Sequence, residues 1–135
     1  MIRLLIADDH AIVREGLKQL VRLTQDIGVA GEAASGTEVL EQIRGGNFDL
    51  LLLDMNMPGI NGIELIKQVK ESQPALPVFV YSMYNDLHLA NAAFKAGASG
   101  YFTKSSDPKM LMEAVRKVYQ GGQFLDPAIS QQTTD

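Results

Sequence analysis

The 135-residue sequence contains no cysteine. It can therefore form neither a disulfide framework nor a thiolate metal site, and it fits a reducing compartment. The sequence also lacks any apolar run near the roughly 18 residues that a membrane span needs, and its N-terminus lacks a signal-peptide pattern. Together these absences predict a cytoplasmic protein without a membrane partner.

Basic residues are few and scattered along the chain. There are 12 lysines and arginines against 16 aspartates and glutamates, which gives a net charge of −4. Because phosphate backbones are bound by clustered basic side chains, this balance argues against a nucleic-acid surface as the main feature of the chain. The 46% of apolar and 21% of charged residues are ordinary for a globular domain and argue against large-scale disorder.

Three nucleotide-binding patterns are absent as well. The segment after the first apolar run reads ADDHAIVREG and has no glycine before Gly16, whereas a dinucleotide-binding turn needs glycines there. No GxxxxGK[ST] phosphate-binding loop occurs. A flavin-phosphate site needs a hydroxyl-rich loop where this sequence has acids. These three classes of nucleotide site are excluded.

What the sequence does contain is a series of short apolar runs separated by amphipathic segments. The strongest runs are continuous rather than alternating, as in parallel strands that are covered on both faces. Five runs are expected to be strands: Ile2–Ala7, Val29–Ala34, Leu50–Leu53, Val78–Ser82 and Gly100–Thr103. Since each interval carries helical spacing, we expect βα repeats and an α/β, doubly wound parallel sheet with helices on both faces.

Capping residues mark the starts of several expected helices. Ser35 and Glu38 form a capping box, and Asn61 begins a similar pattern. Asp107 precedes Pro108, a good N-cap followed by proline at the first helical position. These signals place helix starts directly after three of the loops.

One expected helix, over residues 87–95, is rich in alanine. Its inner face is expected to consist of Leu89, Ala92, Ala93 and Ala96. Small side chains bury less apolar area, so we expect this helix to be held less firmly than the others.

The length fits a single domain. We expect residues 1–121 to form it, because Gly121 and Gly122 stop the last helix. Residues 122–135 are expected to be the start of a linker to a further domain that this chain lacks.

Polar side chains stand at the carboxyl ends of the expected strands, where ligands gather in such sheets. Asp8 and Asp9 follow the first strand, and Asp54 follows the third. Ser82 ends the fourth strand, and Lys104 follows the fifth. All five side chains are expected to point into one pocket.

Three carboxylates at one edge of a sheet repel one another. Two charges about 4 Å apart interact by about 4 kcal/mol at an effective dielectric of about 20. Such a cluster needs a proton or a cation, and oxygen ligands in an open cleft suit Mg²⁺. A carboxylate beside Mg²⁺ is also a nucleophile toward phosphorus, and a lysine and a hydroxyl would hold the added phosphoryl oxygens.

The acids, the hydroxyl and the lysine occur in a family-specific order. DD ends the first strand, D-x-N-M-P-G follows the third, a serine ends the fourth and a lysine follows the fifth. This set resembles the receiver domain of two-component response regulators over residues 1–121. VREGLKQLV, AGASGYFTK and GGQFLDP further resemble the LuxR/NarL-type subfamily, whose output domain is a DNA-binding helix-turn-helix. The resemblance implies a flavodoxin-like (βα)5 fold with strand order 2-1-3-4-5.

The resemblance also implies a phosphoacceptor and a metal site. Asp54 would accept the phosphoryl group and would be one of the ligands of Mg²⁺, the implied cofactor. Asp9 would bind the metal directly, and Asp8 would bind it directly or through water. The backbone carbonyl of Asn56 would complete the protein ligands.

Three further residues receive roles from the resemblance. Lys104 would pair with Asp54 and then with the phosphoryl group, as part of the catalytic set. Ser82 would move to hydrogen-bond a phosphoryl oxygen, and Tyr101 would follow it inward as the second switch residue. One departure from the family pattern is Ser105, which stands where a cis proline commonly follows the lysine.

The implied partners are a sensor histidine kinase and a second copy of the chain. A homodimer would use either the first and fifth helices or the fourth helix, fifth strand and fifth helix. DNA would be bound only through an output domain that this chain lacks. The chain would catalyse its own phosphotransfer and autodephosphorylation, but would act mainly as a signalling switch.

Two other functions stay open at this point. A receiver-like interaction module that signals without phosphate usually lacks one of the acids or the lysine, and this sequence retains them all. A Mg²⁺-dependent phosphohydrolase that uses Asp54 would need a second aspartate placed as a general acid, and the sequence shows none.

Overall fold

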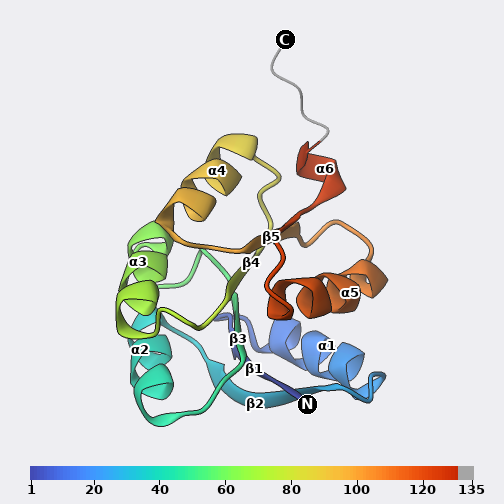
Figure 1. The fold of residues 1–135 in the computed structure, drawn as a ribbon, viewed down its shortest axis with the longest axis horizontal. Coiled ribbons are helices and arrows are strands. Elements are labelled where there is room, and N and C mark those ends of the chain that lie inside the picture. Colours follow the sequence, from blue (N-terminus) through green and yellow to red (C-terminus); the bar gives the residue numbers. More distant parts are fainter. Residues whose placement is uncertain (131–135) are drawn as a thin grey trace.

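Six parallel strands form one sheet within residues 1–130, the part of the chain that the computed structural model describes (Figure 1). The strands are β1 (Ile2–Ala7), β2 (Ile27–Ala33), β3 (Leu50–Leu53), β4 (Val78–Ser82), β5 (Gly100–Thr103) and β6 (Phe124–Leu125). Their order in the sheet is β2-β1-β3-β4-β5-β6. The predicted doubly wound sheet with order 2-1-3-4-5 is confirmed, and β6 extends it beside β5.

Helices cover both faces of this sheet. They are α1 (Ala11–Arg22), α2 (Gly36–Gly45), α3 (Gly62–Ser72), α4 (Leu87–Ala96), α5 (Pro108–Tyr119) and the short α6 (Pro127–Ser130). Helices α2, α3 and α4 lie on one face, and α1 and α5 lie on the other (Figure 1). Within the described part of the chain, no helix is long and apolar enough to cross a lipid bilayer.

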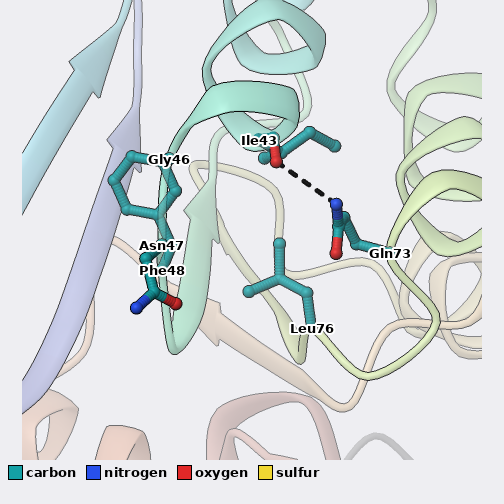
Figure 2. A pocket seen from close by; sticks show the side chains of 6 residues that line it. All are labelled: Ile43, Gly46, Asn47, Phe48, Gln73 and Leu76. Atoms are coloured by element: carbon teal, nitrogen blue, oxygen red, sulfur yellow. Dashed lines mark hydrogen bonds between the residues drawn. The ribbon is translucent and has the colours of Figure 1, made fainter.

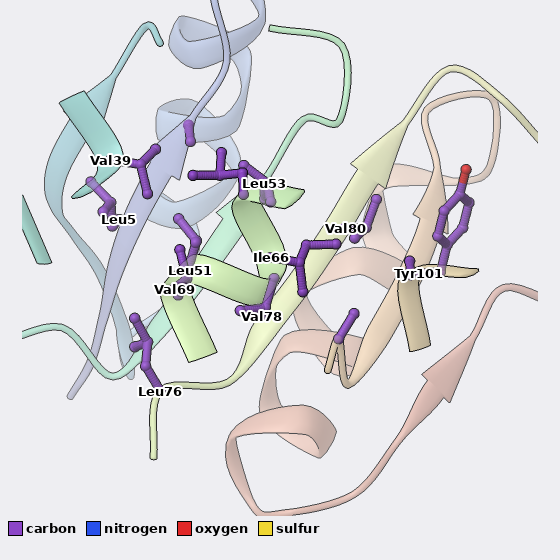
Figure 3. Packing of buried hydrophobic residues seen from close by; sticks show 14 of the residues in the cluster. Leu5, Val39, Leu51, Leu53, Ile66, Val69, Leu76, Val78, Val80 and Tyr101 are labelled. Carbon is purple, nitrogen blue, oxygen red and sulfur yellow. The ribbon is translucent and has the colours of Figure 1, made fainter. Parts of the chain in front are cut away.

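Strand β3 explains why the sequence contains four consecutive leucines. Leu50 and Leu52 pack in the core cluster beneath α1 and α5. Leu51 and Leu53 pack in the opposite cluster, beneath α2 and α3 (Figure 3). All four side chains are at most 2% exposed. Alternation along the strand therefore gives every leucine a buried position, worth about 1.5–3 kcal/mol each relative to exposure.

The three capping signals in the sequence are present as hydrogen bonds. The Ser35 hydroxyl accepts the Glu38 N–H at 3.2 Å, and the Asn61 amide oxygen accepts two N–H groups in the first turn of α3. The Asp107 carboxylate accepts the Lys109 N–H at 3.0 Å. Each cap satisfies backbone donors that the first helical turn leaves unpaired, so the local sequence fixes these boundaries.

The predicted inner face of α4 is wrong in part. Its buried residues are Ala90 and Ala93, while Leu89, Ala92 and Ala96 are only half-buried. The rotation of the helix is set by its packing against α3 and β5, which the local pattern does not contain. Because both buried residues are alanines, α4 buries little apolar area through them.

Residues 122–135 were expected to begin a linker, and they contain a strand and a short helix. The chain turns back to the sheet at Gly121, whose φ of 97° is a conformation that favours glycine. Strand β6 then pairs in parallel with β5, with Leu125 opposite Tyr101. Residues 131–135 of this segment lie outside the described residues.

Asp126 and Ile129 fasten this segment to the domain. Asp126 is only 1% exposed. Its carboxylate accepts the Thr103 N–H at 3.0 Å and the Ala128 N–H at 2.9 Å. The Asp126 N–H donates to the Tyr101 carbonyl at 2.9 Å. Ile129 is fully buried in the cluster that includes the alanines of α4. The segment is thus part of the core.

Truncation of Ile129 tests whether this segment stabilises the fold. We expect Ile129→Ala to lower the free energy of unfolding by about 2–5 kcal/mol, the usual cost of truncating a fully buried isoleucine. Urea unfolding followed by circular dichroism measures the loss. The matched control, Ile12→Ala, truncates an isoleucine that is 83% exposed on α1. It should change the free energy by less than about 0.5 kcal/mol, and equal losses in the two variants would contradict the prediction.

Candidate functional site

The loops after β1 and β3 lie side by side because the two strands are neighbours. Ala7 and Leu53, the last residues of these strands, are paired. The Asp54 N–H donates to the Ala7 carbonyl at 2.9 Å, and the Asp8 N–H donates to the Ala33 carbonyl at 3.0 Å. The sheet therefore fixes the backbone of both aspartates.

Asp8, Asp9 and Asp54 form a group that we call the acidic cluster. One ligand atom from each of these acids and from His10 lies within 4.8 Å of the others. Asp8 and Asp54 are 1% and 4% exposed, whereas the His10 side chain is 59% exposed. The His10 Nδ1 lies 3.1 Å from Asp8 Oδ1 and 3.2 Å from Asp9 Oδ1. The structure thus brings the three predicted acids together, and a histidine joins them from the exposed side.

Lys104 places its ammonium group beside the two buried acids. The Lys104 Nζ donates to Asp8 Oδ2 at 2.9 Å and lies 3.6 Å from Asp54 Oδ2. It also lies 5.4 Å from the centre of the Tyr81 ring. The sequence predicted a pair between Lys104 and Asp54; in the structure one ammonium is shared, with its shorter contact to Asp8.

Burial raises the pKa of Asp54 above its ordinary value, because a buried carboxylate loses hydration. The Asn56 N–H, 3.1 Å from Asp54 Oδ1, and the Lys104 charge both lower this pKa. The charges of Asp8 and Asp9 raise it again. The net direction is upward, so the ionised form of Asp54 is less favoured in the folded protein than in water.

Asn56 lies in the turn that follows the phosphoacceptor candidate. Besides its N–H contact with Asp54, its side-chain Nδ2 donates to the Tyr84 hydroxyl at 3.4 Å. Tyr84 is 50% exposed, so this contact spans the turns after β3 and β4 at the surface. The metal-binding role of the Asn56 carbonyl stays a prediction.

Ser82 and Tyr101, the predicted switch residues, are both fully buried. The Ser82 hydroxyl accepts the Tyr84 N–H at 3.1 Å, and the Tyr101 hydroxyl donates to the Tyr84 carbonyl at 2.9 Å. Burial raises the pKa of the Tyr101 phenol, which keeps it a neutral donor at physiological pH. The loop after β4 thus joins the two predicted switch residues through one backbone position.

Ser105 stands where the family pattern commonly has proline. The Lys104–Ser105 peptide bond is trans, like every other peptide bond in the described residues. The Thr103 hydroxyl accepts the Ser105 N–H at 3.2 Å, and the two hydroxyl oxygens are 2.9 Å apart. This ST-turn, in which the Thr103 hydroxyl accepts a backbone N–H two residues on, stabilises the loop that carries Lys104.

Arg14 contacts the site and was not predicted from the sequence. Its Nη1 donates to the Asp8 carbonyl at 2.6 Å, and its Nε donates to Glu32 Oε1 at 3.0 Å. The segment VREGLKQLV does place Arg14 and Lys18 one helical turn apart on one side of α1. Their shared partner Glu32 lies on β2, and only the tertiary structure brings it to them.

A small cavity of about 60 Å³ lies elsewhere, between the ends of α2 and α3 (Figure 2). It is lined by Ile43, Gly46, Asn47, Phe48, Gln73 and Leu76. The Gln73 Nε2 donates to the Ile43 carbonyl at 3.3 Å and connects the two helices there. Because no lining side chain is titratable, this cavity has no group for acid–base or metal chemistry.

The acidic cluster fits a hard divalent cation. Carboxylate oxygens are the protein ligands that Mg²⁺ prefers, and Mg²⁺ retains several of its waters. The partly exposed Asp9, whose side chain is 30% exposed, leaves one side of the cluster open to those waters. Three carboxylates also carry more negative charge than the single Lys104 ammonium balances. Chemically, the cluster can hold a cation and present Asp54 beside it.

Comparison with known proteins identifies the family to which the chain is similar. The family described as "Response regulator receiver domain" matches residues 4–116. The chain is 34% identical over 129 residues to the transcriptional regulatory protein DegU of Brevibacillus brevis, covering 96% of the chain and 55% of DegU. It is 36% identical over 127 residues to the nitrate/nitrite response regulator protein NarL of Escherichia coli K12, covering 94% and 59%. The chain thus spans little more than half the length of these relatives.

A solved structure gives the same result for the fold. The chain resembles a two-component response regulator of the LuxR family from Aurantimonas sp. SI85-9A1, with a TM-score of 0.92 and 35% identity. The match covers 96% of this chain and 93% of that chain. The resemblance that the sequence motifs indicated is confirmed.

In metal-free buffer containing EDTA, Asp54→Asn is expected to stabilise the fold at pH 7. Because the folded-state pKa of Asp54 is raised, ionising this group costs the folded state more than the unfolded state. The gain should shrink as the pH falls through the raised pKa. It should vanish below the ordinary value of 3.8, where Asp54 is protonated in both states.

Thermal unfolding at pH 7 and at acid pH measures this gain, since roughly 1 kcal/mol shifts the midpoint by about 4 °C in a domain of this size. Glu41→Gln, at an exposed position on α2, is the control and should change the midpoint little at either pH. A lower midpoint for Asp54→Asn than for wild type at pH 7 would contradict the prediction. It would show that Lys104 and the Asn56 N–H stabilise ionised Asp54 by more than burial costs.

Proposed function

The chain belongs to the response regulator receiver domain family, and from this membership we propose that it is a switch activated by phosphorylation of Asp54. A sensor histidine kinase would supply the phosphoryl group. The Asp54 carboxylate would attack phosphorus and form an acyl phosphate, while the kinase histidine leaves as the bond to its nitrogen breaks.

The observation that carries this proposal is the set of charges around Asp54. Asp8 and Asp9 each offer a ligand atom within 4.8 Å, and the Lys104 ammonium lies 3.6 Å away. A carboxylate that attacks a phosphoryl group must approach other negative oxygens, so it needs positive charge on both sides. Lys104 supplies one such charge, and a cation on the acids would supply the other.

We propose Mg²⁺ as that cation, held by Asp8, Asp9, Asp54 and the carbonyl of Asn56. When bound, Mg²⁺ would supply charge neutralisation for the transferred phosphoryl group. Asp8 would then give up its 2.9 Å hydrogen bond with Lys104 in favour of the metal. The Lys104 ammonium would become free to bind a phosphoryl oxygen.

Ser82 and Tyr101 would couple the phosphorylation of Asp54 to a conformational change at the surface. A phosphoryl group on Asp54 would carry roughly two negative charges on three acceptor oxygens, in place of the single charge of the carboxylate. The Ser82 hydroxyl would exchange its 3.1 Å contact with the Tyr84 N–H for a phosphoryl oxygen. Tyr101, whose hydroxyl holds the Tyr84 carbonyl, would stabilise the new position of this loop. Helix α4 follows that loop and is the element that would shift.

The role in the whole protein is also proposed from the family. Residues 1–121 would be the receiver, with residues 122–130 packed against it as part of its core, and a helix-turn-helix output domain would bind DNA. The chain itself would not bind DNA, and the protein would act in the cytoplasm. A homodimer would use α1 and α5. The alternative surface of α4, β5 and α5 would need the edge of β5, which β6 occupies.

Labelling with a small phosphodonor tests the phosphoacceptor. Incubation with acetyl phosphate and Mg²⁺ should add one phosphoryl group to the wild type, measured as an intact mass. Asp54→Asn should stay unmodified, because an amide is not a nucleophile toward phosphorus. Asp49→Asn, at the other end of β3, is the control and should be labelled like the wild type. Labelling of Asp54→Asn to the wild-type extent would overturn the assignment.

A Mg²⁺ titration tests the cofactor. Binding to the folded state should raise the midpoint of thermal unfolding, with a stabilisation of about 2.7 kcal/mol at roughly 100 times the dissociation constant. Asp9→Asn should lose most of this rise, because it removes a carboxylate ligand. If millimolar Mg²⁺ leaves the wild-type midpoint unchanged, the chain is better described as an interaction module that acts without phosphate.

A further inference from the structure

We propose that Arg14 is a positioning residue that holds the loop between β1 and α1 in the conformation that binds Mg²⁺. The inference rests on the proposed function, because it concerns the same metal site. Arg14 is not expected to touch the metal or the phosphoryl group. Its effect would pass through the backbone of Asp8, which leads directly into Asp9.

The contacts of Asp8 show what Arg14 adds to the loop. The Asp8 N–H is fixed by the Ala33 carbonyl at 3.0 Å, and its carboxylate is fixed by Lys104 at 2.9 Å. The Asp8 carbonyl accepts from Arg14 Nη1 at 2.6 Å. All three hydrogen-bonding parts of Asp8 are therefore held, and the carbonyl is held by a side chain from α1.

Asp9 is the ligand whose position depends most on this arrangement. Its side chain is 30% exposed and lies 3.2 Å from His10 Nδ1. The backbone before it is held by Arg14, and the backbone after it is held by the His10 N–H, which donates to Asp8 Oδ1 at 2.8 Å. Release of the Asp8 carbonyl would therefore free the peptide that orients Asp9.

Glu32 holds Arg14 in the orientation that this contact requires. The Arg14 Nε donates to Glu32 Oε1 at 3.0 Å, so the guanidinium is fixed between β2 and the loop. The rigid, planar guanidinium donates to both partners in a fixed geometry. A lysine ammonium in the same place has rotatable donors on a flexible stem and would not fix this geometry. Lys18 Nζ, 2.7 Å from Glu32 Oε2, occupies the other oxygen of the same carboxylate.

Charge and position make opposite predictions for Arg14. As a nearby cation, Arg14 would repel Mg²⁺, so its removal would tighten Mg²⁺ binding. As a positioning residue, Arg14 preorganises the ligands, so its removal would weaken binding, by about tenfold for a group behind a metal ligand. The direction of the change therefore decides between the two roles.

Lys18 provides a matched control. It lies one turn after Arg14 on α1 and contacts the same glutamate. Its ion pairs in the described residues are with Glu15 and Glu32, and none joins it to Asp8 or Asp9. Lys18→Gln removes a cation from the same network without touching the loop.

The experiment measures the Mg²⁺ dissociation constant of the wild type, Arg14→Gln, Arg14→Lys and Lys18→Gln by calorimetry, with folding checked by circular dichroism. We expect about tenfold weaker binding for Arg14→Gln. Arg14→Lys should also weaken binding, although it keeps the charge. Lys18→Gln should bind as tightly as the wild type or slightly more tightly. In metal-free protein, the amide resonances of Asp9 and His10 should shift in the Arg14 variants and not in Lys18→Gln.

Three results would overturn the inference. They are wild-type or tighter Mg²⁺ binding by Arg14→Gln, full retention of affinity by Arg14→Lys, and an equal loss in Lys18→Gln. If Arg14→Gln does not fold, the Arg14→Lys and Lys18→Gln pair gives the same decision. Absence of Mg²⁺ binding by the wild type would instead overturn the proposed function, so the two failures are distinguishable.

Discussion

The site depends on one interaction, the ammonium of Lys104 shared between Asp8 and Asp54. The sheet buries these two carboxylates at the ends of neighbouring strands, where like charges about 4 Å apart repel by about 4 kcal/mol at an effective dielectric of about 20. The ammonium offsets part of this repulsion, and the raised pKa of Asp54 reflects what burial and the other acids leave uncompensated. That residual negative charge would favour a cation beside Asp54, the proposed phosphoacceptor.

The acids cannot relieve their repulsion by moving apart, because the core holds the strands that carry them. The four leucines of β3 pack on both faces of the sheet, and the Asp54 N–H is bonded to the β1 carbonyl of Ala7. Arg14 holds the Asp8 carbonyl from the side of α1. Because this frame holds the acids in place, a bound cation or a proton would be needed to offset their charge.

The C-terminal segment constrains the opposite side of the site. Asp126 accepts the N–H of Thr103, the residue before Lys104, and its own N–H donates to the carbonyl of Tyr101. Strand β5 is thus paired with β4 on one edge and with β6 on the other. A shift of Lys104 or Tyr101 would therefore move the C-terminal segment, because Asp126 is hydrogen-bonded to the backbone of Thr103 and Tyr101.

The sequence by itself determined the parallel sheet, the helix caps and the positions of Asp8, Asp54 and Lys104 at strand ends, because burial periodicity and capping are local properties of the chain. It also determined which acids would meet, since parallel strands end at one edge. Only the tertiary structure decided the rotation of α4, the pairing of β6, the shorter contact of Lys104 with Asp8 and the link between Arg14 and Glu32. Each of these depends on a contact between distant parts of the chain, and the free energy of such a contact is not encoded in either partner's local pattern.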